Sequence, residues 1–373
     1  MTFDVAIVGG GIVGATCALE ATRSGLRVIV IEPGVIGGGA TAAGMGHIVV
    51  MDDSEAQFAL THYSQQLWQE IAPELPREIE YEECGTLWVA ADEEEMNEVR
   101  RKVRFYETRG VAAEILDGKA LAEAEPNLRH GLAGALLVPG DGVVYPPCAA
   151  KYFLDEAQSL GAKLQLGFSA IELSDTGVKL SNGELISAGV TVNATGSWAT
   201  ELTPGIDVQK RKGHLLITDR YPGFVRHQLV ELGYLKSAHS ISSDSVAFNA
   251  QPRKTGQVLI GSSRQYGVDN PKVEAAMLSR MLQRAEEYLP GITKLSAIRT
   301  WTGFRAATPD KLPLIGKCPS YQRLYLATGH EGLGITTSMG TAKLLVDQLL
   351  NRISQIPSTP YLPTRAYQEA MHA

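Results

Sequence analysis

The chain has 373 residues, of which 44% are hydrophobic and 20% are charged, a composition that is typical of folded globular proteins and excludes a disordered chain. A formal net charge of −7, with no long basic run, disfavours nucleic acid and anionic membrane surfaces as partners. Because the length exceeds that of an ordinary single core, we expect two domains.

We expect neither a targeting segment nor a membrane-spanning segment. The first expected strand starts at residue 3, which leaves no room for a secretory signal, and no apolar stretch reaches the ~20 residues of a transmembrane helix. We therefore expect a cytoplasmic protein, with peripheral contact to an inner membrane left open. Four widely spaced cysteines without CxxC spacing predict buried thiols rather than a metal, iron–sulfur or disulfide site: Cys17, Cys84, Cys148 and Cys318.

The N-terminal stretch predicts a dinucleotide-binding βαβ unit. An apolar strand over Phe3–Val8 is followed by a helical pattern over residues 12–24 and a second apolar strand over residues 27–31. Three glycines lie between the first strand and the helix with GxGxxG spacing: Gly9, Gly11 and Gly14. Such glycines permit a tight turn, close approach of a pyrophosphate and close packing of helix on sheet.

Two further features of this unit point to a nucleotide. The first backbone N–H groups of the helix, near Ile12 and Val13, would face the phosphates. Glu32 closes the second strand, where an acidic side chain can hold a ribose hydroxyl. The alternative is a glycine-rich turn without a ligand, but the complete strand, helix, strand and acid favour the dinucleotide site.

A second segment of small residues, 37–47, follows closely and contains Gly39-Ala40-Thr41 and Gly44-Met45-Gly46-His47. Small side chains of this kind suit a backbone that passes close to a large flat ligand. Beyond it we expect helices over residues 52–75, with Ser54 as the N-cap, 93–109 and 148–160, and strands over residues 81–91 and 163–166. A hairpin is expected over residues 170–180, beginning at Ala170.

The hydrophobic pattern changes in the second half of the chain. A strand from residue 189 ends in Asn193-Ala194-Thr195-Gly196-Ser197-Trp198, which suits the carboxyl edge of a parallel sheet. Alternating strands then predict an antiparallel sheet interrupted by a helix over residues 272–289. The expected strands cover residues 213–218, 225–231, 245–249 and 258–262. On the third of these, Phe248 and Asn249 either face a substrate or belong to the core or sheet edge.

These segments together resemble the D-amino-acid oxidase and glycine/sarcosine oxidase superfamily of flavoproteins. In that superfamily the βαβ unit and a GAS-like segment, here Gly39-Ala40-Thr41, bind FAD. An NATGxW segment, here residues 193–198, lies on the phosphate side, and a D-G-x-x-x-P turn, here residues 141–146, marks the return to the flavin domain. The resemblance places His47 beside the isoalloxazine as a candidate active-site residue. The alternative is a loop histidine bonded to backbone.

Residues 301–316 resemble the W-x-G-x-R-P-x-T-x-D-x-x-P-x-I-G signature of glycine oxidase and D-amino-acid dehydrogenases. Arg305 takes the position of their carboxylate-binding arginine, and a planar guanidinium can hold a carboxylate by two parallel hydrogen bonds. The alternative is a structural ion pair. Sarcosine oxidases link a cysteine to the flavin where this chain has Gly303, so the resemblance implies non-covalent FAD.

Residues 325–336 resemble the segment that wraps the pyrimidine end of the flavin in this superfamily, and we expect the next helix over residues 340–351. The positive end of a helix there would stabilise charge that develops on the reduced ring. Glycine and sarcosine oxidases place an arginine or lysine in this loop, whereas this chain has Gly332 and Leu333. Their absence argues against an efficient oxygen-using oxidase.

The predicted fold is therefore α/β, with a Rossmann-like FAD-binding domain of the glutathione-reductase type and a second, antiparallel-sheet substrate domain. We assign residues 1–75, 140–205 and 300–373 to the first domain and residues 76–139 and 206–299 to the second. The resemblance implies FAD contacts from Gly9, Gly11, Ile12, Val13, Gly14, Glu32, Gly39, Ala40, Thr41, Gly44, Met45, Gly46, His47, Ala170, Ala194, Thr195, Gly196, Trp198, Gly303, Arg305, Gly329, His330, Gly332, Leu333, Gly334, Ile335 and Thr336.

The resemblance further implies an FAD-dependent amino-acid dehydrogenase that transfers a hydride from the substrate α-carbon to flavin N5. Candidate catalytic residues are Arg305, His47 and His330, and candidate substrate contacts are Arg305, His47, Asn249 and Phe248. The motifs look most similar to the flavin subunits of D-hydroxyproline, proline, opine and cyanide-forming glycine dehydrogenases, with cis-4-hydroxy-D-proline as the first-choice substrate. Such subunits often work beside iron–sulfur partners. A peroxide-forming oxidase and a non-catalytic flavoprotein are the alternatives.

Overall fold

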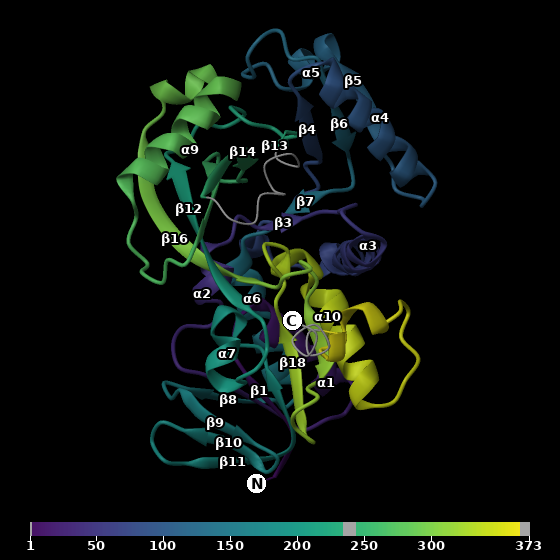
Figure 1. Cartoon of the computed structure of the whole chain (residues 1–373), viewed down its shortest axis with the longest axis vertical. Helices are drawn as coiled ribbons and strands as arrows, with labels where there is room; N and C mark the ends of the chain where they lie inside the picture. Colours follow the sequence, from purple (N-terminus) through teal and green to yellow (C-terminus); the bar gives the residue numbers. More distant parts are fainter. Residues whose placement is uncertain (1, 234–243, 366–373) are drawn as a thin grey trace.

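The structure is a computed structural model that describes residues 2–233 and 244–365. Two eight-stranded sheets dominate it, the first in the lower half of Figure 1 and the second in the upper half. The first sheet has the order β17-β18-β11-β1-β2-β8, with the hairpin β9–β10 attached to β11. Its strands are β1 (Phe3–Val8), β2 (Val28–Glu32), β8 (Lys163–Leu166), β9 (Ala170–Ser174), β10 (Gly177–Leu180), β11 (Leu185–Asn193), β17 (Leu314–Lys317) and β18 (Leu324–Thr328).

The first sheet is the parallel sheet that the N-terminal unit predicts. From β18 to β8 all neighbours on this path run parallel, whereas the edge strand β17 and the attached hairpin β9–β10 pair in antiparallel fashion. Its helices are α1 (Ile12–Arg23), α3 (Glu55–Ile71), α6 (Pro146–Ser159) and α10 (Gly334–Leu349). Helix α1 packs against both α6 and α10. Because α1 consists largely of small and apolar residues, it is buried over most of its length.

The second sheet has the order β16-β12-β15-β14-β13-β4-β6-β5. It is antiparallel except between β4 and β13, which run parallel, so the predicted wholly antiparallel sheet is mixed. Its strands are β4 (Thr86–Ala90), β5 (Glu114–Asp117), β6 (Gly134–Val138), β12 (Gln209–Thr218), β13 (Gln228–Glu231), β14 (Ser245–Pro252), β15 (Val258–Tyr266) and β16 (Ala297–Ala307). Helices α4 (Glu93–Glu107), α5 (Gly118–Ala124) and α9 (Ala275–Tyr288) pack on it.

Short elements connect the two sheets. Strands β3 (His47–Ile48) and β7 (Gly142–Val143) pair with each other between them, beside α2 (Gly39–Ala43), and α7 (Ala199–Leu202) follows β11. Strands β12 and β16 are long and run from the upper sheet toward the lower one (Figure 1). The cofactor and substrate parts of the sequence therefore meet along β3, α2, β12 and β16.

Most predicted elements are present with small changes in their bounds. Ser54 is confirmed as an N-cap, because its Oγ accepts from the Gln57 N–H at 3.1 Å. The expected helix over residues 340–351 instead begins at Gly334, directly after the loop that precedes it. The expected strand over residues 81–91 is shorter, as β4 covers only Thr86–Ala90. Glu82 instead forms an isolated bridge with Val143.

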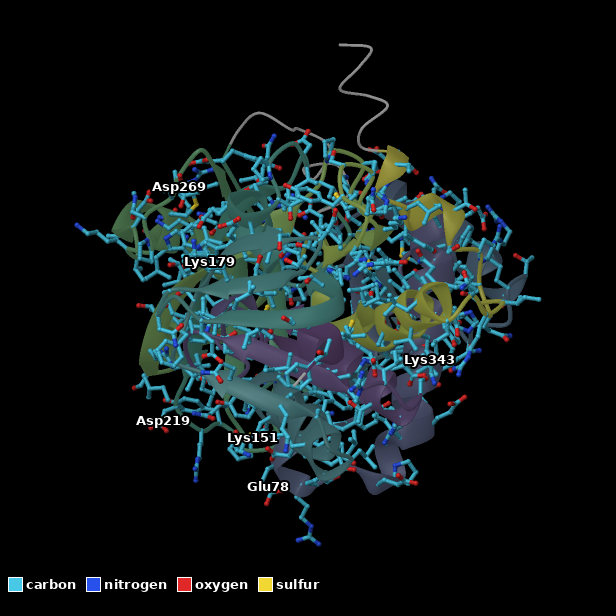
Figure 2. The ribbon with its side chains drawn as sticks, turned by 90° about the horizontal axis from the view of Figure 1, so that it is seen from below. Glu78, Lys151, Lys179, Asp219, Asp269 and Lys343 are labelled. Atoms are coloured by element: carbon cyan, nitrogen blue, oxygen red, sulfur yellow. The ribbon has the colours of Figure 1, made fainter. Side chains whose placement is uncertain are left out.

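No helix within residues 2–233 and 244–365 is long and apolar enough to cross a bilayer. Charged side chains such as Lys151, Lys179 and Asp219 lie at the periphery of the molecule (Figure 2). The proposed domain boundaries stay a prediction, and residues 1, 234–243 and 366–373 within them lie outside the described part of the chain. Limited proteolysis would test them.

Candidate active site

A cavity of about 820 Å³ is lined by residues from both sheets and from the elements between them. Nearly all residues that the sequence predicts as FAD contacts line this cavity. The exceptions are Gly14, Gly329 and Thr336, which lie just behind the wall. The cavity is thus lined by five segments that lie far apart in the sequence: residues 8–13, 38–49, 194–198, 303–306 and 330–335.

One end of the cavity has the geometry of a dinucleotide site. Gly9 has φ +113°, and a Cβ there would lie 2.5 Å from the Ala194 carbonyl oxygen, while a Cβ on Gly14 would overlap the Gly9 carbonyl oxygen. Helix α1 begins after Gly11 with no side-chain cap and no acidic residue in its first turn. Its positive end can therefore face an anion such as a diphosphate, although the Ile12 N–H, expected to face the phosphates, donates to Thr41 Oγ1 instead.

Glu32 lies at the same end, and both of its carboxylate oxygens are oriented by backbone. The Gly10 N–H donates to Oε2 and the Gly34 N–H to Oε1, each at 2.8 Å. A carboxylate oxygen has more than one lone pair, so these bonds leave capacity for ribose hydroxyls. The predicted ribose contact therefore fits the geometry.

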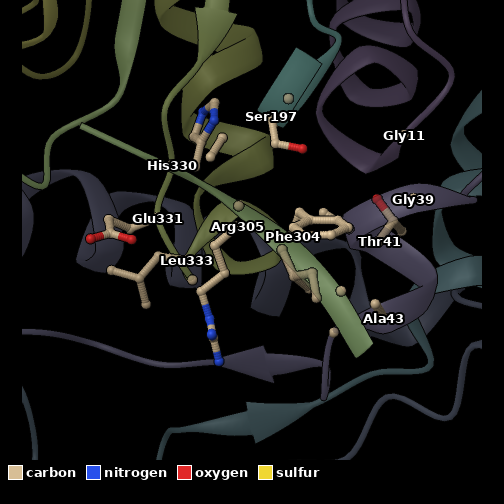
Figure 3. Close-up of a pocket in the computed structure, with 18 of the residues that line it drawn as sticks. Gly11, Gly39, Thr41, Ala43, Ser197, Phe304, Arg305, His330, Glu331 and Leu333 are labelled. Atoms are coloured by element: carbon tan, nitrogen blue, oxygen red, sulfur yellow. The ribbon is translucent and has the colours of Figure 1, made fainter. Parts of the chain in front are cut away.

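Close contacts join α2 to the start of α1 and to strand β16. Thr41 Oγ1 accepts from the Ile12 N–H at 3.0 Å, which ties α2 to the start of α1. A Cβ on Gly303 would overlap the Ala43 side chain, so β16 and α2 approach each other only because residue 303 is glycine. Figure 3 shows Phe304 and Arg305 of β16 between Thr41 and Ala43 of α2 on one side and the loop of Glu331 and Leu333 on the other.

Three arginines gather at the other end of the cavity. Arg305 of β16 donates from Nη1 to the Ser263 carbonyl at 3.0 Å, and Arg211 of β12 forms an ion pair with Glu331. Burial, with repulsion from Arg211, lowers the pKa of Arg305 to about 10 and that of Arg264 to about 9. All three guanidinium groups line the cavity. With one carboxylate among them, the region has an excess of positive charge that suits an anionic substrate.

The loop at Gly332 and Leu333 has no basic residue of its own, which is the argument against an efficient oxidase drawn from the sequence. Arg211 of β12 reaches this loop and forms an ion pair with Glu331. The pair brings a guanidinium group to the loop, but the Glu331 carboxylate balances its charge. The argument against an efficient oxidase therefore stays a prediction.

His47 lies on β3, in the middle of the site. Its Nδ1 contacts Gln228 Oε1, its Nε2 lies 3.3 Å from Asn249 Nδ2, and its own carbonyl accepts from Thr336 Oγ1 at 2.8 Å. The alternative of a ring bonded to backbone is therefore wrong, since both ring nitrogens contact side chains. Burial and repulsion from Arg305 lower the pKa of His47, while the bond to Gln228 opposes the shift. The ring is neutral at neutral pH.

The remaining predicted residues take different places. Phe248 is fully buried and stacks on Tyr288 with ring centroids 4.7 Å apart, so its side chain belongs to the core of the second sheet, which was the alternative. Its neighbour Asn249 points the other way along the strand and reaches His47. His330 is buried, its Nε2 lies 3.0 Å from Thr341 Oγ1, and burial lowers its pKa to about 3. Neutral and hydrogen-bonded, it fastens the loop to α10. Its catalytic role stays a prediction.

Sequence reasoning missed several polar residues of the site, above all Gln228, Arg211 and Arg264. Gln228 is fully buried in β13, and its amide also bonds to Thr86 Oγ1 and the Gly142 carbonyl. The expected strand over residues 225–231 also contains Arg226, His227 and Glu231, so no local signal sets Gln228 apart. The partners of its side chain are far away in sequence.

Comparisons with known proteins agree with this geometry. A model of the family described as FAD dependent oxidoreductase matches residues 4–348, and the chain therefore belongs to this DAO family. The protein is an FAD-dependent oxidoreductase, and the predicted α/β fold class and cofactor are confirmed. The close backbone turn at Gly9 and Gly14, together with the start of α1, fits the diphosphate of FAD.

Relatives match over nearly the whole chain. Glycine oxidase of Geobacillus kaustophilus is 29% identical and covers 97% of both chains, and its crystal structure superposes with a TM-score of 0.88 at 28% identity, covering 98% of this chain and 99% of the other. Hydrogen cyanide synthase subunit HcnC of Pseudomonas aeruginosa is 28% identical over 99% of this chain and 97% of its own. L-proline dehydrogenase from P. horikoshii has the same fold, with a TM-score of 0.88, 24% identity, and coverage of 100% of this chain and 98% of the other.

Proposed function

We propose that this protein oxidises the Cα–N bond of a small D-amino or cyclic imino acid to an imine and passes the electrons to an acceptor other than oxygen. The first-choice substrate is cis-4-hydroxy-D-proline or D-proline. The observation that carries the proposal is the position of Arg305. Its guanidinium lines the cavity, and its strand, β16, packs against α2 beside the expected FAD site. The relatives named as glycine oxidase support an amino-acid substrate.

The chain's own residues account for binding and orientation. Arg305 would hold the substrate carboxylate, with its guanidinium fixed by the Ser263 carbonyl, and the nearby Arg211 and Arg264 would add to the positive potential around the carboxylate. The neutral His47 and Asn249 lie at the same cavity wall and would face the amino group. When bound, FAD supplies the two-electron chemistry, with N5 as the hydride acceptor. The buried surroundings exclude water from the reacting carbon.

Two other functions have specific support. A glycine- or sarcosine-type oxidase is favoured by the glycine oxidase relatives and by the Arg211 guanidinium group at the loop where oxidases carry a base. An opine dehydrogenase flavin subunit is favoured by the excess of guanidinium groups, because opines carry more than one carboxylate. If the protein is a dehydrogenase, we propose that it passes its electrons to an iron–sulfur partner subunit. The relative HcnC, which is named as a subunit, is in line with this proposal.

The test is an anaerobic screen of D- and L-amino and imino acids against the purified protein, with flavin absorbance as the readout. We expect bleaching with a cyclic imino acid, dye reduction under turnover and little hydrogen peroxide in air. Stoichiometric peroxide would favour the oxidase. Preference for a substrate with two carboxylates would favour the opine enzyme, and no bleaching with any compound would refute the proposal.

A further inference from the structure

The hydrogen bonds around Gln228 determine which nitrogen of His47 carries the proton. Gln228 Nε2 donates to the Gly142 carbonyl at 2.8 Å and to Thr86 Oγ1 at 3.2 Å. A carbonyl oxygen can only accept, so the amide group must turn its nitrogen toward Gly142 and its oxygen toward His47. Because that oxygen is itself an acceptor, His47 Nδ1 bears the hydrogen. The backbone carbonyl of Gly142 in β7 thereby fixes the tautomer.

In this tautomer His47 Nε2 is an acceptor within the substrate cavity. It lies 3.3 Å from Asn249 Nδ2, beyond the usual range of a strong hydrogen bond, so this contact is easily exchanged for a better donor. Asn249 Oδ1 is buried and has no hydrogen-bond partner among the described residues. His47, Asn249 and Arg305 all line the cavity. His47 Nε2 is therefore an acceptor at the cavity wall whose weak contact with Asn249 can be exchanged, close to Arg305, whereas the buried Asn249 Oδ1 does not face the cavity.

We propose that His47 Nε2 is the base that takes a proton from the substrate's ammonium group, with Gln228 as a positioning residue. The inference rests on the proposed function. One N–H bond of the ammonium breaks, its electron pair stays on the substrate nitrogen, and the proton forms a new bond to His47 Nε2. The free amine can then lose its α-hydrogen as hydride, whereas an ammonium cannot.

The charges around His47 keep it in the accepting form. Arg305 is the charged group that acts on the ring, and both its repulsion and burial lower the pKa of His47 below 6.5. Asp141 precedes Gly142 on the β7 side, and burial raises its pKa to about 7, while Cys84, which contacts the Gln228 backbone, has its pKa raised to about 12. The side chain from α10 is the uncharged Thr336. The ring is thus neutral from neutral pH down to its lowered pKa, below which flavin reduction is lost.

The first test reads the tautomer directly in the holoenzyme. With 15N-labelled histidine, His47 should show a protonated Nδ1 and an unprotonated Nε2, assigned by the signals that disappear in His47→Gln. In Gln228→Leu, which removes the acceptor, the two nitrogens should become mixed in protonation. A proton on Nε2 of the native protein would overturn the proposal whatever the activity.

The second test is the pH dependence of anaerobic flavin reduction. His47→Gln should slow reduction by ~10²–10⁴-fold at pH 7, the usual worth of a general base, and its rate should then rise about tenfold per pH unit as the substrate amine loses its proton in solution. Gln228→Glu should move the acid limb to higher pH, because a carboxylate beside Nδ1 stabilises the imidazolium. His62→Gln, the same change outside the cavity on α3, should leave rate and profile as in the native protein.

The outcomes separate this inference from the function on which it rests. If no amino or imino acid bleaches the flavin, both fail. If bleaching occurs but His47→Gln keeps the native rate and profile, the proposed function stands and the role of His47 is refuted. If His47→Gln does not fold, the Gln228→Glu profile decides, and an unshifted acid limb would refute the inference.

Discussion

Removing the guanidinium of Arg305 is the most informative perturbation of the site. Two charge-assisted hydrogen bonds to a carboxylate are worth about 1.5–3 kcal/mol each, so Arg305→Ala should cost about 3–6 kcal/mol of transition-state stabilisation. That corresponds to a loss of ~10²–10⁴-fold in kcat/KM. The fold should tolerate the change, because it relieves repulsion with Arg211 and Arg264 and leaves only the Ser263 carbonyl without its donor.

The assay is anaerobic flavin reduction against substrate concentration, with FAD content measured in parallel. Arg305→Lys should fall between the native protein and Arg305→Ala, because lysine keeps the charge but loses the planar fork. Arg299→Ala is the matched control, since Arg299 lies exposed on the same strand and outside the cavity. If Arg305→Ala keeps native kcat/KM, or if the control loses as much, the carboxylate assignment is refuted.

Three further predictions test the surroundings. Gly303→Val should weaken FAD binding, measured by flavin fluorescence, because its side chain would push Ala43 and α2 out of place, and unchanged affinity would contradict this contact. His330 has its folded pKa below its unfolded value, so its contribution to stability is lost as pH falls below 6.5, by about 2 kcal/mol at pH 5. Urea unfolding should show less acid sensitivity in His330→Gln, and equal sensitivity would refute the shift. Asp52→Asn should cost about 3–5 kcal/mol of unfolding free energy, because it leaves the buried Lys102 ammonium without its paired carboxylate, whereas a loss below 1 kcal/mol would show that the pair is dispensable.

Features that depend only on neighbouring residues in the chain could be predicted from the sequence. The strand, glycine turn, helix and acid of residues 3–32 each depend on neighbours in sequence, so pattern and propensity were sufficient. The same holds for the Ser54 cap and the hairpin of β9 and β10. The resemblance to a known family then placed the separate glycine-rich segments around one cofactor, which no local pattern could do.

What the sequence could not show are contacts between distant strands. Gln228 meets His47 across 181 residues, and Arg211 meets Glu331 across 120 residues, so neither pair has a local signature. The parallel pairing of β4 with β13 has the same origin, because it joins segments about 140 residues apart. Such pairings follow from the packing of the whole second sheet rather than from any one strand.

The account depends on one bound FAD that spans the cavity, with its reactive ring beside Arg305. The most direct measurement is a crystal structure of the purified protein with tetrahydrofuran-2-carboxylate, which has the ring and carboxylate of proline but no ionisable nitrogen. We predict FAD stretched from Gly9 and Glu32 to the loop of Gly332, with the carboxylate held by the guanidinium of Arg305. A colourless protein, a flavin bound elsewhere, or a carboxylate remote from Arg305 would contradict it.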